Sequence, residues 1–411
     1  MPQDALAGFA VCPSGLEDAL VQELTAMSGF VSVSKGRGGA SFSASAQAIC
    51  RANLWARIPT RILVTAGRGN FRKPEDIRQI ATKILWEQWF TFRQTLRIDL
   101  AVGREPQLEK PLARNFATLL VKDGICDRFR TARGERPSID TTHPDIRVWA
   151  FIDQNELTLY LDTSGEPLFK RGWRQAKGEA PLRENLAAAL IALTEWDGQS
   201  PLMDPFCGSG TLLIEAMQRA LRLPPGYLPQ SPREFAAEHF HAQSPMGQVN
   251  WRALRAEAKE AIDRITAGLT QHPAPAMQGS DIDPRMLQVA QGNAQRALPT
   301  QAAAAIQWVT GAMDQIKPIA ASGLLVANPP YGKRLEQPGE AAAFERGLGE
   351  ALKKHFAGWQ AWILSDNLKL DSGMRLKASR RVPVFNGDIE CRWMRFDMVP
   401  GSNRERDKEI S

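Results

Sequence analysis

The sequence predicts an α/β protein of more than one domain, with a doubly wound parallel sheet in its second half. The chain has 411 residues, enough for two or three domains of roughly 100–200 residues each. Its hydrophobic share of 43% and charged share of 23% are those of an ordinary globular protein. From about residue 200 onward, short apolar stretches alternate with longer helical ones, as parallel strands joined by helices do.

The first part of the chain reads as two small units of mixed strands and helices. From Phe9 to about Arg57 the pattern is strand, helix, strand, strand, helix, with the helices over 16–27 and 46–57. The second unit ends in a hairpin whose tight turn is Gln154-Asn155. Its predicted elements are a strand over 61–67, a helix over 74–90, a strand over 96–102, a helix near 112–130, and strands over 145–153 and 156–164.

A polar connection then leads into a helix over 181–196, on which five large apolar side chains fall on one face. They are Leu182, Leu186, Leu190, Leu193 and Trp196. The alternating region follows, with strands over 201–206, 276–283, 306–311, 323–330 and 361–366 and helices over 211–221, 284–298 and 342–356. An insertion at 222–250 interrupts it, and the polar tail from residue 401 is typical of disorder.

Basic residues are concentrated in the first half of the chain. The net charge is +6, a modest excess that also occurs in proteins without nucleic-acid partners. Clusters lie at 35–39, 68–73, 127–136 and 170–174, several of them beside Phe or Trp. Each cluster alone is equally compatible with a solvated surface, whereas together they indicate a basic, aromatic-containing face of the kind that binds nucleic acid.

Metal, disulfide and membrane roles are not indicated. The cysteines are odd in number and never in C-x-x-C spacing, and the histidines form no H-E-x-x-H pair. The longest apolar run, 186–193, is far short of the ~18 residues that a membrane span needs. The N-terminus lacks the pattern of a signal peptide. We therefore expect a cytoplasmic protein with reduced thiols and no metal.

A rigid corner follows the apolar strand that ends at Ala327. Asn328, Pro329, Pro330 and Tyr331 stand there in a row. Two prolines fix φ and remove two backbone donors, which leaves their carbonyls free to accept. Taken alone, the tetrapeptide is as compatible with a simple strand-terminating turn as with a binding corner.

A glycine-rich turn follows the first strand of the alternating region. Asp204 ends this strand, and Gly208 and Gly210 would let the backbone approach a ligand before the next helix offers its free amides. The turn is neither G-x-G-x-x-G nor a Walker loop. A ligand with a carboxylate and an amine suits it better than a nucleotide phosphate.

Acidic residues follow the next two strands. Asp281 could accept both hydroxyls of a ribose, and Asp283 reads equally well as a helix N-cap. Asp314, at the third strand end, could accept from the amino group of an adenine. A cofactor with amino-acid and adenosine parts would span these sites.

The order of these four strand ends resembles the class I S-adenosylmethionine-dependent methyltransferases that modify exocyclic or amide nitrogens. The resemblance implies that Asn328 and the Pro329 carbonyl accept the hydrogens of the target amine, that Pro330 stiffens the corner, and that Tyr331 stacks on a flipped base. Cys207 lies at a helix start, which could activate its thiol, but the role of a small loop residue fits it better. The implied cofactor contacts are Asp204, Pro205, Cys207, Gly208, Ser209, Gly210, Thr211, Asp281, Ile282 and Asp314.

A narrower resemblance covers the chain from Phe9 to about Met398. The segments that carry it are "DIRVWAFI", "LTLYLDTSGEPLFKRGWR", "LRENLAAALI" and "NGDIECRWMRF". Through these segments the chain resembles the THUMP-domain RNA guanine-N2 methyltransferases, above all the guanine-N2 half of the bacterial 23S rRNA enzyme. Arg183 and Glu184 match that family less closely. The implied domains are ferredoxin-like (1–59), THUMP (60–166), a linker (167–181), a Rossmann-like S-adenosylmethionine-dependent methyltransferase domain (182–400) and a disordered tail (401–411).

The resemblance implies methyl transfer to guanine N2 in 23S rRNA, with the base flipped out of its stack. The partner would be RNA, with neither a membrane nor a metal. The long bacterial enzyme carries a second methyltransferase domain that this chain is too short to hold, which leaves the rRNA position open. The alternatives are tRNA guanine-N2 methylation, adenine-N6 methylation, and a non-catalytic RNA-binding factor in ribosome assembly. Candidate RNA contacts are Arg68, Arg72, Lys73, Arg128 and Arg133.

Overall fold

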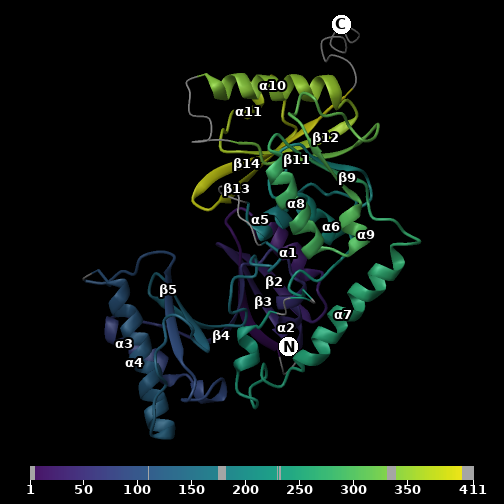
Figure 1. Cartoon of the computed structure of the whole chain (residues 1–411). Helices are drawn as coiled ribbons and strands as arrows, with labels where there is room; N and C mark the ends of the chain where they lie inside the picture. Colours follow the sequence, from purple (N-terminus) through teal and green to yellow (C-terminus); the bar gives the residue numbers. More distant parts are fainter. Residues whose placement is uncertain are drawn as a thin grey trace. The chain divides into compact units, whose positions relative to one another are not determined.

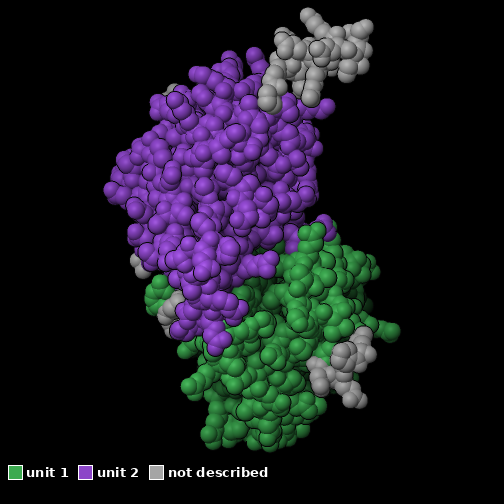
Figure 2. Space-filling model, turned by 90° about the vertical axis from the view of Figure 1, so that its right-hand side faces the viewer, with its two compact units in different colours: residues 1–12, 20–170, 229–258 green, residues 13–19, 171–228, 259–411 purple. Residues whose placement is uncertain are grey.

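The structure, a computed structural model, describes residues 5–109, 111–174, 182–228, 230, 233–330 and 339–399. Tyr331, the tail from residue 401 and half of the predicted linker therefore lie outside the described residues. The chain forms two compact units (Figure 2). Unit 1 comprises residues 1–12, 20–170 and 229–258, and unit 2 comprises residues 13–19, 171–228 and 259–411.

Unit 1 is built on one seven-stranded sheet in the order β2-β3-β1-β4-β7-β6-β5. The predicted ferredoxin-like and THUMP regions share this sheet, because β1 pairs with β4 and Ala10 lies opposite Ile62. Its strands are β1 (Ala5–Val11), β2 (Phe30–Gly36), β3 (Gly39–Ser45), β4 (Arg61–Asn70), β5 (Leu96–Val102), β6 (Ile146–Asp153) and β7 (Glu156–Asp162). Along β6, Val148, Ala150 and Ile152 are buried and alternate with less buried neighbours, so one face of the sheet carries the core.

The helices of unit 1 follow the predicted order with one difference. The predicted helix over 74–90 is too long, because α3 ends at Lys83 and a separate 3-10 turn, η1, follows. Trp86 causes the break: its buried indole donates to the Ala81 carbonyl at 2.7 Å and so takes up a carbonyl at the end of α3. The elements are α2 (Ala46–Trp55), α3 (Pro74–Lys83), η1 (Trp86–Gln88), α4 (Arg114–Arg133) and η2 (Ala236–His239).

Two helices have residues in both units, α1 (Glu17–Thr25) and α7 (Trp251–Gly268). The sequence did not predict α7. Residues 229–258 group with unit 1, although the predicted methyltransferase domain runs through them. Residues 229–250 of the predicted insertion therefore group with unit 1, and residues 222–228 with unit 2.

Unit 2 is built on a second seven-stranded sheet, in the order β10-β9-β8-β11-β12-β14-β13. The first five strands are parallel as predicted, but β14 pairs antiparallel with both β12 and β13. The hairpin at Gly387, which has a φ of 66°, forces the last pair to be antiparallel. The strands are β8 (Leu202–Asp204), β9 (Met277–Asp281), β10 (Ile306–Thr310), β11 (Gly323–Ala327), β12 (Trp359–Ser365), β13 (Arg380–Asn386) and β14 (Ile389–Asp397).

Helices cover both faces of this sheet. In Figure 1, α10 lies over β11, β12 and β14. On the opposite face, Trp393 of β14 donates from its indole to the Leu190 carbonyl of α5 at 3.1 Å. The prediction of a packed helix is confirmed, since residues 184–191 of α5 are all buried, but the helix is shorter than predicted and leaves Leu182 and Trp196 outside it. The helices are α5 (Glu184–Leu193), α6 (Thr211–Ala220), α8 (Pro284–Ala297), α9 (Thr300–Ala304), α10 (Glu340–His355) and α11 (Leu370–Gly373).

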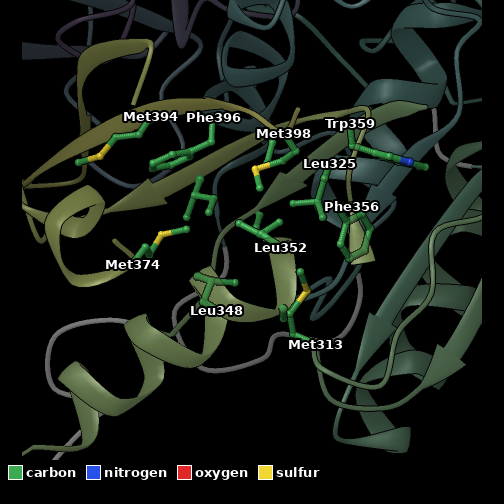
Figure 3. Close-up of a cluster of buried hydrophobic side chains, with 14 of the residues drawn as sticks. Met313, Leu325, Leu348, Leu352, Phe356, Trp359, Met374, Met394, Phe396 and Met398 are labelled. Atoms are coloured by element: carbon green, nitrogen blue, oxygen red, sulfur yellow. The ribbon is translucent and has the colours of Figure 1, made fainter. Parts of the chain in front are cut away.

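A methionine-rich core joins α10 to the sheet. Figure 3 shows Leu348 and Leu352 of α10 among side chains from β11 and β14. Because Ala361 and Ile363 of β12 point into this cluster, the residue between them, Trp362, faces the other side, where it stacks on Trp393 with ring centroids 5.6 Å apart. Among the helices described, none is long and apolar enough to cross a membrane.

Candidate active site

A cavity of about 860 Å³ opens in unit 2 at the carboxyl ends of its parallel strands. Loops after β8, β9, β10 and β11 contribute to it, and ligands of open α/β sheets bind at this edge. The predicted residues that line it are Asp204, Pro205, Cys207, Gly208, Ser209, Thr211, Asp281, Ile282, Asp314, Asn328 and Pro330. Gly210 and Pro329 are not among the lining residues.

The two glycines of the turn before α6 have different roles. Both have positive φ, 51° at Gly208 and 81° at Gly210, a conformation that side chains disfavour. A Cβ added at Gly208 would meet nothing within 4 Å, whereas at Gly210 it would lie 3.1 Å from the Trp308 ring and 3.2 Å from Ala290. Gly208 therefore keeps space free at the cavity, and Gly210 allows the turn to pack on α8 and β10.

A buried carboxyl group stands at the floor of the cavity. The Asp204 side chain is 2% exposed, and its Oδ1 accepts from the Phe206 amide at 3.0 Å. Burial, with a further contribution from Asp281, raises the pKa of Asp204 to about 8. Such a group gains most from a ligand that brings a positive charge or donors.

Asp281 is held in place by the backbone. Its Oδ2 accepts from the Gly208 amide at 3.0 Å, and its Oδ1 accepts from the Asp283 amide at 2.9 Å. Asp283 caps α8, as predicted, because its side chain accepts from the Arg285 amide. Between the two aspartates Ile282 is 74% exposed, and it offers the cavity an apolar surface against which a flat ring could lie.

The side-chain oxygen of Asn328 has no hydrogen-bond partner among the described residues. This atom, Oδ1, is buried. An unsatisfied buried acceptor costs roughly 1–3 kcal/mol, which a ligand donor would offset. Pro330 lines the cavity beside it, whereas Pro329 is buried behind.

Cys207 is not an activated thiol. Burial raises its pKa well above the ordinary value, and Asp204 and Asp281 add to this. This agrees with the role of a small loop residue rather than a nucleophile. Within the described ranges, no three His, Cys, Asp or Glu side chains are grouped so that they could hold a metal ion.

An aromatic pair at the cavity escaped the sequence analysis. Phe206 and Phe344 both line it, with ring centroids 5.8 Å apart in an edge-to-face arrangement. Phe206 adjoins the predicted glycine-rich turn, so the sequence did contain a local indication that this residue lies at the cavity. Phe344 lies on α10, and only the packing of that helix brings it to the cavity.

The basic clusters divide into exposed and internal ones. Arg68, Arg72, Lys73 and Arg133 are exposed on unit 1. Arg128 instead forms an ion pair, with its Nε donating to Glu87 at 3.0 Å, and this lowers the pKa of Glu87.

In the cluster at 170–174 Lys170 is exposed, but the assignment to a basic surface was wrong for Arg171 and Arg174. Arg171 pairs with Glu215 and Arg174 with Glu184, and all four side chains are less than 10% exposed. Both pairs lie inside unit 2.

Three family models match the chain in succession. Residues 8–63 match the RlmL ferredoxin-like domain, residues 71–162 the THUMP domain, and residues 171–395 a domain described as RMKL-like, methyltransferase domain. These matches confirm the predicted series of fold types.

Individual relatives agree with the family models. A Synechocystis sp. protein, provisionally named RNA methyltransferase slr0064, is 36% identical, with 95% of this chain and 96% of that protein covered. The ribosomal RNA large subunit methyltransferase K/L of Syntrophotalea carbinolica is 35% identical over 95% of this chain. The chain spans only about half of that enzyme, 53% of its length. The crystal structure of SMU.472, provisionally named a methyltransferase and complexed with SAH, superposes with a TM-score of 0.82 at 24% identity, covering 97% of this chain and 100% of that one.

Proposed function

The chain belongs to the RMKL-like methyltransferases, and from this membership we propose that it methylates the exocyclic N2 of a guanine in 23S rRNA. S-adenosylmethionine is the methyl donor. The membership confirms the resemblance found in the motifs. The observation that carries the proposal is the buried Asn328 Oδ1 after β11, which has no donor within the described part of the chain and lies at a cavity lined by acidic residues. Support for rRNA comes from the name of the large-subunit relative.

The cavity residues suit the proposed donor. S-adenosylmethionine, when bound, supplies a methyl group on a positively charged sulfur. Asp204 would accept from the amine of its amino-acid part, and Gly208 leaves room for the backbone to approach that part. Asp281 would accept from the ribose hydroxyls, while Ile282 would cover one face of the adenine and Asp314 would accept from the adenine amino group.

Asn328 would orient the target amine. The lone pair of an exocyclic NH2 group is conjugated into its base, so the amine must be held with its hydrogens bonded away and its lone pair directed at the methyl group. The buried Oδ1 of Asn328 can accept one of these hydrogens, and the Pro329 carbonyl would accept the other. In this arrangement Asn328 positions the amine and is not a base.

Unit 1 would bind the RNA. The THUMP match covers residues 71–162, and exposed arginines lie in and beside it, where they can contact phosphates. A cytoplasmic location is part of the same proposal.

Gly208→Ala tests the cofactor end of the site. The new methyl group would project into the cavity from a backbone with positive φ, so we expect the affinity for S-adenosylhomocysteine to fall by about tenfold or more. Isothermal calorimetry measures this directly. The matched control is Gly134→Ala, which has a φ of 76° and open space around it but lies in unit 1. Alanine at this position has a similar cost in backbone strain, and the affinity of this variant for S-adenosylhomocysteine should equal that of the unchanged protein. Equal affinity in both variants would contradict the assignment of Gly208.

Nucleoside analysis tests the reaction itself. Mass spectrometry of rRNA and tRNA from cells with and without the gene should show loss of N2-methylguanosine from large-subunit rRNA only. Loss of N2-methylguanosine from tRNA would support the proposed reaction but show that the substrate is tRNA and not rRNA. Unchanged methylated nucleosides in every fraction would point to a non-catalytic RNA-binding factor.

A further inference from the structure

Two arginines of the segment 170–174, Arg171 and Arg174, are buried, and Arg174 contacts residues that line the cavity. Arg174 donates from Nε to Glu184 Oε1 at 2.8 Å and from Nη2 to the Leu182 carbonyl at 3.0 Å. It also donates from Nη2 to Thr211 Oγ1 at 2.9 Å and from Nη1 to Ser209 Oγ at 3.3 Å. One side chain thus connects the start of α5 to the glycine-rich turn.

Three of these four partners belong to residues that line the cavity, namely Leu182, Ser209 and Thr211. Arg174 does not line it. Its side chain is 9% exposed and that of Glu184 is 7% exposed. Arg174 therefore acts on the site only through the residues that it holds.

The same turn is held from its other side by α8. Asn293 donates from Nδ2 to the Ser209 carbonyl at 3.1 Å, and Arg296 donates to Asn293 Oδ1 at 2.6 Å. Arg296 also donates from Nε to the Trp173 carbonyl at 2.8 Å. Because Trp173 precedes Arg174 in the chain, these bonds close a ring around the turn: Arg174, Ser209, Asn293, Arg296 and Trp173.

A closed ring of buried and partly buried hydrogen bonds leaves its members few alternative arrangements. The turn within the ring contains two glycines with positive φ, and an unsupported turn of this kind would sample many conformations. Burial raises the pKa of Glu184, while the positive charge of Arg174 lowers it and favours the ionised carboxylate. A neutral side chain at position 174 would remove both the charge partner and the two bonds to the turn.

We propose that Arg174 is a positioning residue that holds the glycine-rich turn in the conformation that binds the cofactor. The inference rests on the proposed function, because it takes S-adenosylmethionine as the ligand of this turn. Arg174 restrains the hydroxyl groups of the turn, and Asn293 restrains its carbonyl.

The test compares Arg174→Gln with Arg171→Gln in the full chain. Arg171 is the matched control, because it lies in the same segment and forms a buried ion pair with Glu215 of α6. Both variants should lower the thermal midpoint. Only Arg174→Gln should weaken S-adenosylhomocysteine binding, by roughly tenfold, the effect of losing one or two hydrogen bonds that order a site. Only this variant should lose hydrogen-exchange protection at the amides of 208–211.

A double-mutant cycle separates positioning from general destabilisation. Thr211→Val should weaken binding in the unchanged protein but add little in the Arg174→Gln background, since its partner is already gone. Arg174→Lys keeps a charge for Glu184 without the planar fork that reaches the turn. If Arg174→Gln does not fold, the lysine variant should fold and still bind more weakly.

Two results would overturn the inference. One is an Arg174 variant that folds and binds S-adenosylhomocysteine as tightly as the unchanged protein. The other is an equal loss of affinity in the Arg171 and Arg174 variants. Absence of binding by the unchanged protein would be a different outcome, since it would contradict the proposed cofactor rather than the role of Arg174.

Discussion

Asn328→Ala is expected to lower kcat by at least about a hundredfold, the order of effect seen when one fixed polar contact to a reacting group is removed. Asn328 Oδ1 is buried without a donor among the described residues, so it is already placed for a hydrogen of the target amine. Alanine removes this acceptor and leaves the amine free to rotate away from the methyl group. The measurement is single-turnover methyl transfer to an rRNA fragment with labelled S-adenosylmethionine.

The binding steps provide the control for this variant. Calorimetry should give an affinity for S-adenosylhomocysteine within a few fold of the unchanged protein, because Asn328 lies on a different strand end from Asp204 and Asp281. RNA affinity should be similarly preserved. A variant with normal turnover would remove Asn328 from the mechanism, and one that no longer binds the cofactor would make it a structural residue of the cavity.

Asp204→Asn should stabilise the empty protein and impair cofactor binding. The pKa of Asp204 is about 8 in the folded state, against an ordinary value of 3.8. Between these two pH values the folded protein holds a proton that the unfolded chain releases, so the free energy of unfolding falls as pH rises through this window. Asparagine carries no such charge. At pH 8 the variant should therefore be more stable by an amount on the order of 5 kcal/mol.

Thermal unfolding at pH 5 and pH 8 checks this prediction. The midpoint of the unchanged protein should lie well below that of the variant at pH 8, and the gap should narrow at pH 5. Affinity for S-adenosylhomocysteine should fall by about tenfold or more in the variant, because a neutral amide replaces the carboxylate that faces the amine. Asp314→Asn is the control: it removes an exposed carboxylate from the same cavity, so stability should change little. Parallel pH profiles for the unchanged protein and Asp204→Asn would refute the raised pKa.

The parts of the site that could be predicted are those written in consecutive residues. Gly208 follows the strand that ends at Asp204. The strand end and the turn both depend on local backbone rules, so the turn can be predicted from the sequence of this segment. The same holds for the corner at Asn328 and for the N-cap at Asp283. These segments are distant from one another in the sequence. They meet at the cavity because parallel strands share one edge of a sheet.

Features that depend on packing could not be predicted. Phe344 reaches the cavity because α10 packs on the sheet through Leu348 and Leu352, and no local pattern reports this. The raised pKa of Asp204 depends on how deeply the strand end is buried. Arg171 and Arg174 read as surface charge because composition does not reveal the direction of a side chain. Neither β13 nor β14 was predicted, and their direction could not have been, because the strand pattern is the same for parallel and antiparallel pairing.

The two units are interleaved along the chain, since unit 1 includes residues 229–258 and unit 2 includes residues 13–19. This has a consequence for biosynthesis. Domains that occupy one continuous stretch can fold as soon as they leave the ribosome, but unit 1 lacks its last segment until residue 258 has been translated. At ~5–20 residues per second, the first half must wait several seconds with an incomplete core. No single cleavage point would release either unit whole.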